Sequence, residues 1–122
     1  MKQVLILLAA AFAFTAEAHH GWAAFDHDKT VTFQGTVTAF RFLNPHSVVE
    51  FDAKDQSGKL QKWQGELTSA SQLSAKGWAA NSLNKGDEIN IAGYPARGGV
   101  NVMRISKLTL ASGKELKIVL GN

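Results

Sequence analysis

The 122-residue sequence contains no cysteine, two prolines and one tyrosine. Without cysteine the chain can form neither a disulfide framework nor a thiolate metal site. The chain has 13 Lys and Arg and 10 Asp and Glu, which leaves a net charge of +3. The basic residues are scattered along the chain and form no cluster. Proteins that bind nucleic acid gather basic side chains into a patch or stripe. We therefore set nucleic acid aside as a partner.

No apolar run is long enough to span a bilayer. The longest covers residues 4–14, eleven residues, whereas a membrane-spanning helix needs about 20. It follows Lys2 and precedes Ala16-Glu17-Ala18, a small-x-small pattern that signal peptidase cuts after. Residues 1–18 are therefore predicted to be a signal peptide, which leaves a periplasmic or secreted chain with no membrane span. The short run and the cleavage pattern disfavour an uncleaved anchor.

The chain that remains after cleavage has the size of one domain. Removing 18 of the 122 residues leaves 104, enough for one compact domain and too few for two. Residues 19–29 show no clear period and are predicted to be an N-terminal arm, followed by a β-domain over residues 30–122. Trp22 and Phe25 are the arm's only large apolar side chains, and we expect them to pin it to the domain.

Several segments alternate apolar and polar residues in the manner of half-buried strands. The predicted strands cover residues 30–43, 47–53, 60–67, 88–94 and 100–110, with a short edge strand over 115–120. Gly35 inside the first segment indicates a bend or a bulge. A change of parity within residues 100–110 indicates a second bulge.

One short helix is predicted between the third and fourth strands. Ser69 is its expected N-cap, with Gln72 as the capping-box partner, and Gly77 is expected to end it. Trp78 and Leu83 are expected to continue a plug beneath the sheet. Three strands, one helix and two more strands is the order of an OB-type barrel. We predict a mainly β, OB-like five-stranded barrel, with an up-and-down β-sandwich as the alternative.

The histidines suggest a metal site. Cleavage at the predicted position makes His19 the first residue, so that a free α-amine and an imidazole sit on one residue. Together with His20 and His46, these nitrogens form a donor set that favours Cu(II) in a tetragonal, T-shaped site. Zinc fits as well, with a water in the fourth position. Asp26 or His27 can close the coordination shell.

The same histidines also have a plainer interpretation. Tandem histidines near a chain terminus are often only solvated. His46, which follows Pro45, can be a turn residue that bonds to a neighbouring carbonyl. His27 lies between Asp26 and Asp28, a setting typical of a solvated histidine.

A ligand-binding face is predicted where the loops after the first and fourth strands meet. These loops are residues 43–46 and 94–99. The side chains expected on this face are Asn44, Tyr94, Arg97, Glu66 and Trp22. Glu66 is expected to pair with Arg97 or Arg41, or to face water.

A set of short motifs runs through the whole predicted mature chain. In order they are His19-His20-Gly21-Trp22-Ala23-x-Phe25-Asp26, Gly35-Thr36-Val37, Asn44-Pro45-His46, Trp63-x-x-Glu66, Leu73-x-x-x-Gly77-Trp78, Ser82-Leu83-x-x-Gly86-Asp87 and Gly93-x-Pro95. They resemble the small exported bacterial proteins grouped as domain of unknown function 6152, which commonly begin their mature form with His-His and a small residue. The resemblance implies periplasmic export and a compact β-domain. It implies no activity, so the copper prediction comes from the residues alone.

Three functions fit these observations. The first is a periplasmic Cu(II)-binding protein that delivers, buffers or senses copper, with the metal ion and another periplasmic protein as partners. The second is a metal-free module that holds a small ligand or a protein on the loop face. The third is a copper-dependent oxidase. It is ranked last because no extended aromatic platform for a substrate is visible in the sequence. No nucleophile elbow, phosphate loop or dinucleotide fingerprint is present, so the sequence favours a binding protein over an enzyme.

Overall fold

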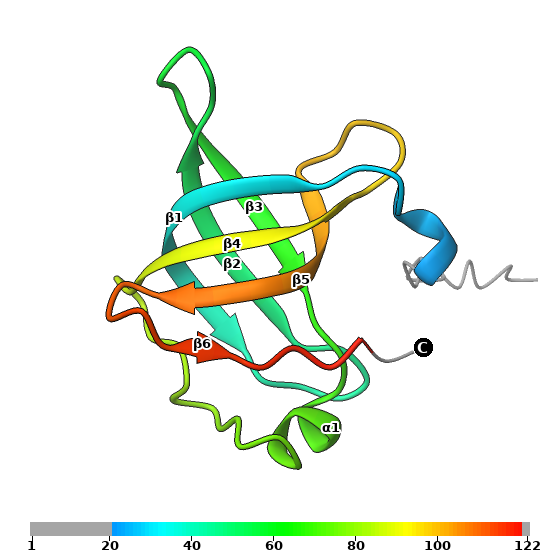
Figure 1. Cartoon of the computed structure of the whole chain (residues 1–122), viewed down its shortest axis with the longest axis vertical. Coiled ribbons are helices and arrows are strands. Elements are labelled where there is room, and N and C mark those ends of the chain that lie inside the picture. Colours follow the sequence, from blue (N-terminus) through cyan, green and yellow to red (C-terminus); the bar gives the residue numbers. More distant parts are fainter. Residues whose placement is uncertain (1–20, 121–122) are drawn as a thin grey trace, which may run out of the picture.

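The strands of the computed structural model, which describes residues 21–120, wrap into a barrel (Figure 1). Their bounds agree with the predicted segments to within two residues, except at the last strand. The elements are a 3-10 turn η1 (Trp22–Ala24), β1 (Val31–Arg41), β2 (Val48–Lys54), β3 (Leu60–Glu66), α1 (Ala70–Ser74), β4 (Glu88–Pro95), β5 (Val102–Leu110) and β6 (Glu115–Leu116).

Five strands close the barrel. β1 pairs antiparallel with both β2 and β4, β2 pairs with β3, and β4 pairs with β5. A parallel pairing of β3 with β5 completes the ring, and β6 adds a short hairpin beside β5. Because this pairing joins the two outer strands, the chain is a closed barrel and not the alternative sandwich. The prediction of a mainly β five-stranded barrel with one short helix between strands 3 and 4 is confirmed.

β1 coils strongly because its first half pairs with β4 and its second half with β2. A Cβ on Gly35 would lie 2.7 Å from Cδ2 of Phe51, so glycine permits the close approach of β2 there. The register shift itself follows between Val37 and Ala39. The parity change predicted in β5 is also a bulge, because the pairing with β4 skips Ser106.

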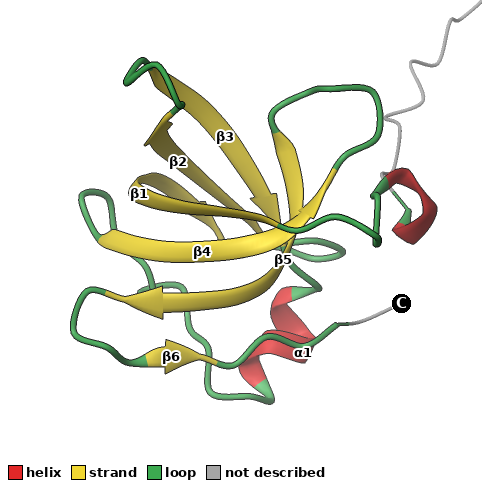
Figure 2. Cartoon of the chain, turned by 45° about the horizontal axis from the view of Figure 1, so that its top comes forward, coloured by secondary structure: helices red, strands yellow, loops and turns green. Residues whose placement is uncertain are grey.

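The lower end of the barrel is closed by α1 and the segment after it (Figure 2). Leu73 is fully buried in the core, together with Trp78 and Leu83, as predicted. The indole nitrogen of Trp78 donates to the carbonyl oxygen of Lys117 at 2.8 Å. The carbonyl of Lys117 therefore bonds to a side chain and not to a neighbouring strand. Lys117 lies in the segment 115–120, where the predicted edge strand was too long. The observed β6 ends at Leu116.

Ser69 begins α1 as predicted, because its side-chain oxygen accepts from the backbone nitrogen of Gln72 at 3.2 Å. The reciprocal half of the capping box is absent from the described chain, since the Gln72 side chain bonds to the hydroxyl of Thr68 instead. Gly77, with φ of +91°, lets the chain turn away after the helix. A side-chain N-cap such as Ser69 stabilises a helix by about 1 kcal/mol.

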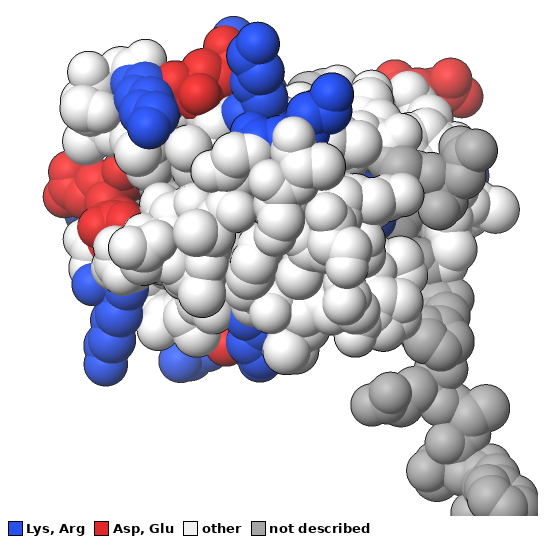
Figure 3. Space-filling model, turned by 90° about the horizontal axis from the view of Figure 1, so that it is seen from below, with Lys and Arg blue, Asp and Glu red and all other residues white. Residues whose placement is uncertain are grey.

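The surface seen from the helix side carries its charged residues mainly at the edges (Figure 3). Residues 42–49 and 67–75, which form the β1–β2 loop and α1 with their flanks, contain no Lys, Arg, Asp or Glu. Among residues 21–120, no helix is long and apolar enough to cross a membrane.

Candidate functional site

The N-terminal arm meets the barrel at the loop between β4 and β5 (Figure 1). The backbone nitrogen of Asp26 donates to the carbonyl oxygen of Pro95 at 2.8 Å. Phe25 is 1% exposed and pins the arm as predicted. Trp22 does not help to pin it by burial, because 46% of its surface stays exposed.

His27 lies against two aromatic rings. Its imidazole stacks on Trp22 with the ring centroids 3.9 Å apart, and the ring of Tyr94 lies 4.8 Å away. Nε2 donates to the carbonyl oxygen of Trp22 at 2.8 Å. Because that carbonyl can only accept, the neutral imidazole carries its proton on Nε2 and a lone pair on Nδ1. Nδ1 is buried and has no hydrogen-bond partner within residues 21–120. His27 is therefore held in place and is not a freely solvated side chain.

Asp26 is an anion whose oxygens already have partners. One carboxylate oxygen accepts from the backbone nitrogen of Asp28 at 3.1 Å, and the other lies 3.5 Å from the Lys29 ammonium. The hydrogen bond from Asp28 is the largest cause that lowers the pKa of Asp26, and the charges of Arg97 and Lys29 act in the same direction. Arg97 also donates to the carbonyl oxygen of Ala23 at 3.3 Å. Both side chains hold the arm, and Asp26 is a poorer candidate ligand than His27.

His46 lies, half buried, on a firmly held loop between β1 and β2. The side-chain oxygen of Asn44 accepts from the backbone nitrogen of Ser71 at 3.1 Å, and the peptide bond before Pro45 is cis. Ser47 is fully buried and exchanges backbone hydrogen bonds of 3.0 and 2.9 Å with the segment after β3. Asn44 thus ties the loop to α1, and His46 keeps a fixed position on the barrel.

The strand register links the His46 loop to the arm. Val48 at the start of β2 lies opposite Glu66, Glu66 lies opposite Arg104, and Arg104 lies opposite Tyr94. Neighbouring strands are about 4.8 Å apart, so this row covers about 14 Å of the barrel surface. The loops after β1 and β4, predicted to flank one face, therefore lie at the two ends of one short row, which we call the outer row.

Arg104 is a charged residue of the outer row that sequence reasoning missed. It is only 5% exposed, and burial lowers the pKa of its guanidinium, while the Glu66 carboxylate opposes that shift. Neither cation expected beside Glu66 pairs with it, since Arg41 bonds to Glu50 at 2.9 Å and Arg97 bonds to the arm. No pattern in the sequence marks Arg104, because an outward position on a predicted strand is ordinarily exposed.

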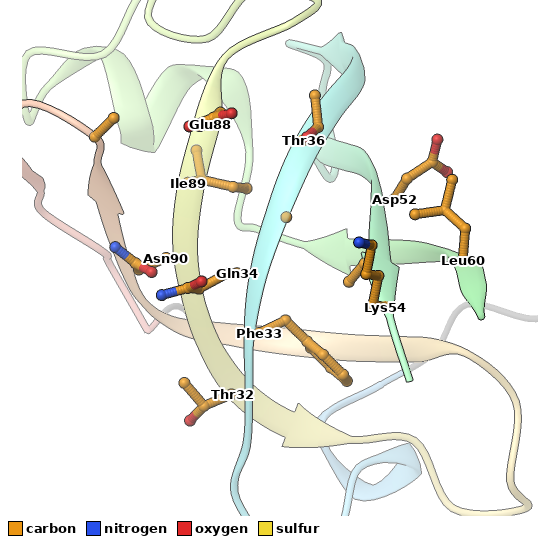
Figure 4. A pocket seen from close by; sticks show the side chains of 13 residues that line it. Thr32, Phe33, Gln34, Thr36, Asp52, Lys54, Leu60, Glu88, Ile89 and Asn90 are labelled. Atoms are coloured by element: carbon orange, nitrogen blue, oxygen red, sulfur yellow. The ribbon is translucent and has the colours of Figure 1, made fainter. Parts of the chain in front are cut away.

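A groove that the sequence did not predict crosses β1 between β4 and the β2–β3 hairpin (Figure 4). This groove has a volume of about 640 Å³ and is bordered by Lys54 on one side and by Glu88 and Asn90 on the other. Within residues 21–120, the side chains of Gln34, Lys54 and Asn90 have no hydrogen-bond or ion-pair partner. The lining comes from several strands that the fold brings together, so hydrophobic periodicity along the sequence could not predict this groove.

The sequence model of one family, described as a family of unknown function (DUF6152), matches residues 7–104. The chain belongs to this family. The resemblance seen in the motifs is thereby confirmed, and the DUF6152 match includes every residue predicted for the site. No curated protein matches the chain.

The described part of this DUF6152 protein contains only some of the predicted metal ligands. His19 and His20 lie outside residues 21–120. Among the described residues, no group of three or more His, Asp or Glu side chains is placed to hold a metal ion. His46 and His27 are therefore the predicted imidazole donors whose surroundings can be described, and they lie near opposite ends of the outer row.

Proposed function

We propose that this DUF6152 protein is a periplasmic or secreted protein that binds Cu(II) through a mature N-terminal histidine. The proposed donors are the α-amine and ring of His19, the ring of His20 and the ring of His46. Cleavage of residues 1–18 is part of the proposal, as is the assignment of the barrel to the OB type. The bound copper would then be delivered, buffered or sensed in the compartment to which the chain is exported.

The observation that carries this proposal is the outer row. The arm contacts β4 and its loop at the Tyr94 end, and the His46 loop begins at the Val48 end. Two residues of extended chain separate Gly21 from His19 and span up to about 7 Å. That length, together with two imidazole side chains, is of the order needed to bridge a row of about 14 Å.

The donor chemistry favours copper. The chain offers amine and imidazole nitrogens and no thiolate, and Cu(II) has the highest affinity among the divalent first-row ions for such nitrogen sites. An α-amine is ordinarily protonated below a pKa of about 8 and must lose that proton to bind the metal. Copper affinity is therefore expected to rise with pH, and zinc is the expected competitor.

The groove across β1 favours a second candidate function, a metal-free binding module. Its free amide and ammonium groups suit a small polar ligand with several hydroxyl or carbonyl groups. This site would lie between β4 and the β2–β3 hairpin and not on the predicted loop face. If it is the working site, substitution of Asn90 and Lys54 would abolish ligand binding while His46→Gln would not.

The test of the copper proposal compares two N-termini. Mass spectrometry of the exported protein should show His19 as its first residue. Cu(II) is then titrated into that protein and into the same chain with its α-amine acetylated. Acetylation removes the amine donor and adds no new one, and we expect the affinity to fall by roughly 10- to 100-fold or more. Equal affinities, or an exported chain that begins elsewhere, would remove the α-amine from the site.

A further inference from the structure

We propose that the groove across β1 binds a free dipeptide, whose α-amine is held by two carboxylates and whose carboxylate is held by an ammonium and two amides. This inference rests on the second candidate function, the metal-free binding module, and names its ligand. It does not depend on the copper site, because the described residues that line the groove include none of the proposed copper ligands.

Two carboxylates lie in one row across the outer face of the groove. Thr36 in β1 is opposite Asp52 in β2 and is also opposite Glu88 in β4. Figure 4 shows these three side chains toward the same end of the groove. An ionised carboxylate only accepts hydrogen bonds, so this row, which we call the acidic row, suits an ammonium group.

A second row, two residues away along each of the three strands, presents donors. Gln34 in β1 lies opposite Asn90 in β4. Lys54 continues this row on β2, because its neighbour Ala53 is the partner of Gly35. The ammonium group only donates hydrogen bonds, and both side-chain amides have N–H donors. This row, which we call the amide row, suits a carboxylate.

The separation of the two rows matches the length of a dipeptide. A strand advances about 3.3 Å per residue, so positions two residues apart are about 7 Å apart. Two residues of extended chain also span up to about 7 Å, whereas a single amino acid spans about half of that. A dipeptide that lies along β1 can therefore place its α-amine on the acidic row and its carboxylate on the amide row. The groove, at about 640 Å³, has the volume of a small-molecule site.

The wall of the groove beside Lys54 is apolar and firmly held. Leu60 lies opposite Lys54 and is 59% exposed, so it favours an apolar side chain on the second residue of the dipeptide. The turn between these two residues is fixed by Asp55, whose carboxylate accepts from the backbone nitrogens of Ser57 and Lys59 at 2.9 and 3.0 Å. A wall that is already ordered loses little conformational freedom when a ligand binds.

An ordinary solvated sheet surface is the rival explanation. Glu50, two residues from Asp52 on β2, pairs with Arg41 at 2.9 Å. Asp52 lies opposite Lys62 in β3, but within residues 21–120 the two side chains form no ion pair. The Glu88 carboxylate likewise has no partner in that range. The acidic row is therefore available to a ligand, whereas Glu50 is not.

Nuclear magnetic resonance of the unsubstituted exported protein tests the site. Alanyl-leucine is added in the presence of EDTA, which keeps metal ions away from the dipeptide. We expect the side-chain amide resonances of Gln34 and Asn90 to move and those of Gln64, which bonds to Glu50 outside the groove, to stay. Resonances of Gln34 and Asn90 that do not move would overturn the proposal.

Blocked dipeptides test the two rows separately. Acetylation of the amine or amidation of the carboxylate removes one charge, and each should lower the affinity by about tenfold or more. Lys54→Met should lower the affinity for alanyl-leucine to a similar extent but leave that for its amide unchanged. Asp52→Asn combined with Glu88→Gln should weaken the free dipeptide and not the acetylated one. Lys107→Met, at an exposed lysine on β5 outside the groove, is the control and should bind as the parent does. Equal affinities for the free and blocked dipeptides would overturn the assignment of the rows.

The outcomes separate this inference from the function on which it rests. If alanyl-leucine does not bind but the neutral sugar trehalose moves the same amide resonances, the binding module stands and the dipeptide is the wrong ligand. If neither compound binds, both fail. The copper titration is a separate measurement and is unaffected in either case.

Discussion

The interior of the barrel and the outer row with its arm are built in different ways. The interior is a set of buried apolar side chains from β1, β2, β4 and β5, against which Trp63 of β3 packs partly buried, and it is closed below by Leu73, Trp78 and Leu83. The arm and outer row combine a half-exposed stack of Trp22 on His27 with a buried guanidinium, and His46 lies half buried on the adjoining loop. Substitutions in the interior are expected to lower stability, whereas a substitution in the half-exposed stack of the arm should have little effect on stability. Substitutions in the two regions should therefore separate folding from metal binding.

The largest effect is expected from Leu73→Ala in the plug. Leu73 is fully buried, so its truncation removes apolar contacts and leaves a cavity. We expect the free energy of unfolding to fall by about 2 to 5 kcal/mol, measured by urea denaturation. Cu(II) affinity at low temperature, where the variant is still folded, should not change. A loss of affinity in the folded variant would break the separation between the two regions.

Gly35→Ala should have a smaller effect on the coil of β1. The added methyl group would lie 2.7 Å from the Phe51 ring and 3.1 Å from the Asp52 carbonyl oxygen, so β1 and β2 would have to move apart. Overpacking of this kind costs about 1 to 3 kcal/mol. Thermal unfolding of Gly35→Ala beside the turn variant Gly21→Ala, whose Cβ meets nothing within 4 Å, provides the comparison. Equal melting temperatures would contradict the close packing at Gly35.

Trp22→Leu tests the other region. Because Trp22 is 46% exposed, we expect a change of no more than about 0.5 kcal/mol in the free energy of unfolding. Loss of the stack should nevertheless loosen the arm that leads to the proposed N-terminal donors and lower Cu(II) affinity by roughly tenfold. Isothermal titration of the folded variant measures this, with Leu60→Ala, at an exposed leucine on β3, as the control. A large loss of stability in Trp22→Leu would show that the stack belongs to the folding core.

Asp55→Asn lies in the β2–β3 hairpin, away from both regions, and should have the smallest effect. Hydrogen bonds from Ser57, Gln61 and the Lys59 backbone lower the pKa of Asp55 below its ordinary value. The folded pKa is therefore below the unfolded one, so the stabilisation is present above the unfolded pKa and is lost as the pH falls through the folded pKa. Parent and variant should differ slightly in stability at neutral pH and converge in strong acid. A difference that grows on acidification would contradict this sign.

The sequence was informative wherever a pattern repeats along the chain. Alternation located the five barrel strands, the parity change located the bulge at Ser106, and the cap at Ser69 located α1. The edge strand was predicted too long because Ile118 packs on the core without a strand partner, a choice that alternation does not distinguish.

The candidate site could be predicted only as a set of residue types. Histidines and carboxylates are visible in a sequence, but their partners come from contacts across the fold. Trp22 stacks on His27, Arg104 becomes buried beside Glu66, and Asn44 turns toward α1, and each contact depends on how the barrel closes. The groove across β1 likewise depends on how β1, β2 and β4 lie beside one another.

The most direct measurement is the electron paramagnetic resonance spectrum of the chain that begins at His19 after addition of one equivalent of Cu(II). We expect a single tetragonal Cu(II) species with coupling to several nitrogen nuclei, and a changed spectrum in His46→Gln. Unbound aqueous Cu(II), or a spectrum that His46→Gln leaves unaltered, would contradict a copper site assembled across the outer row.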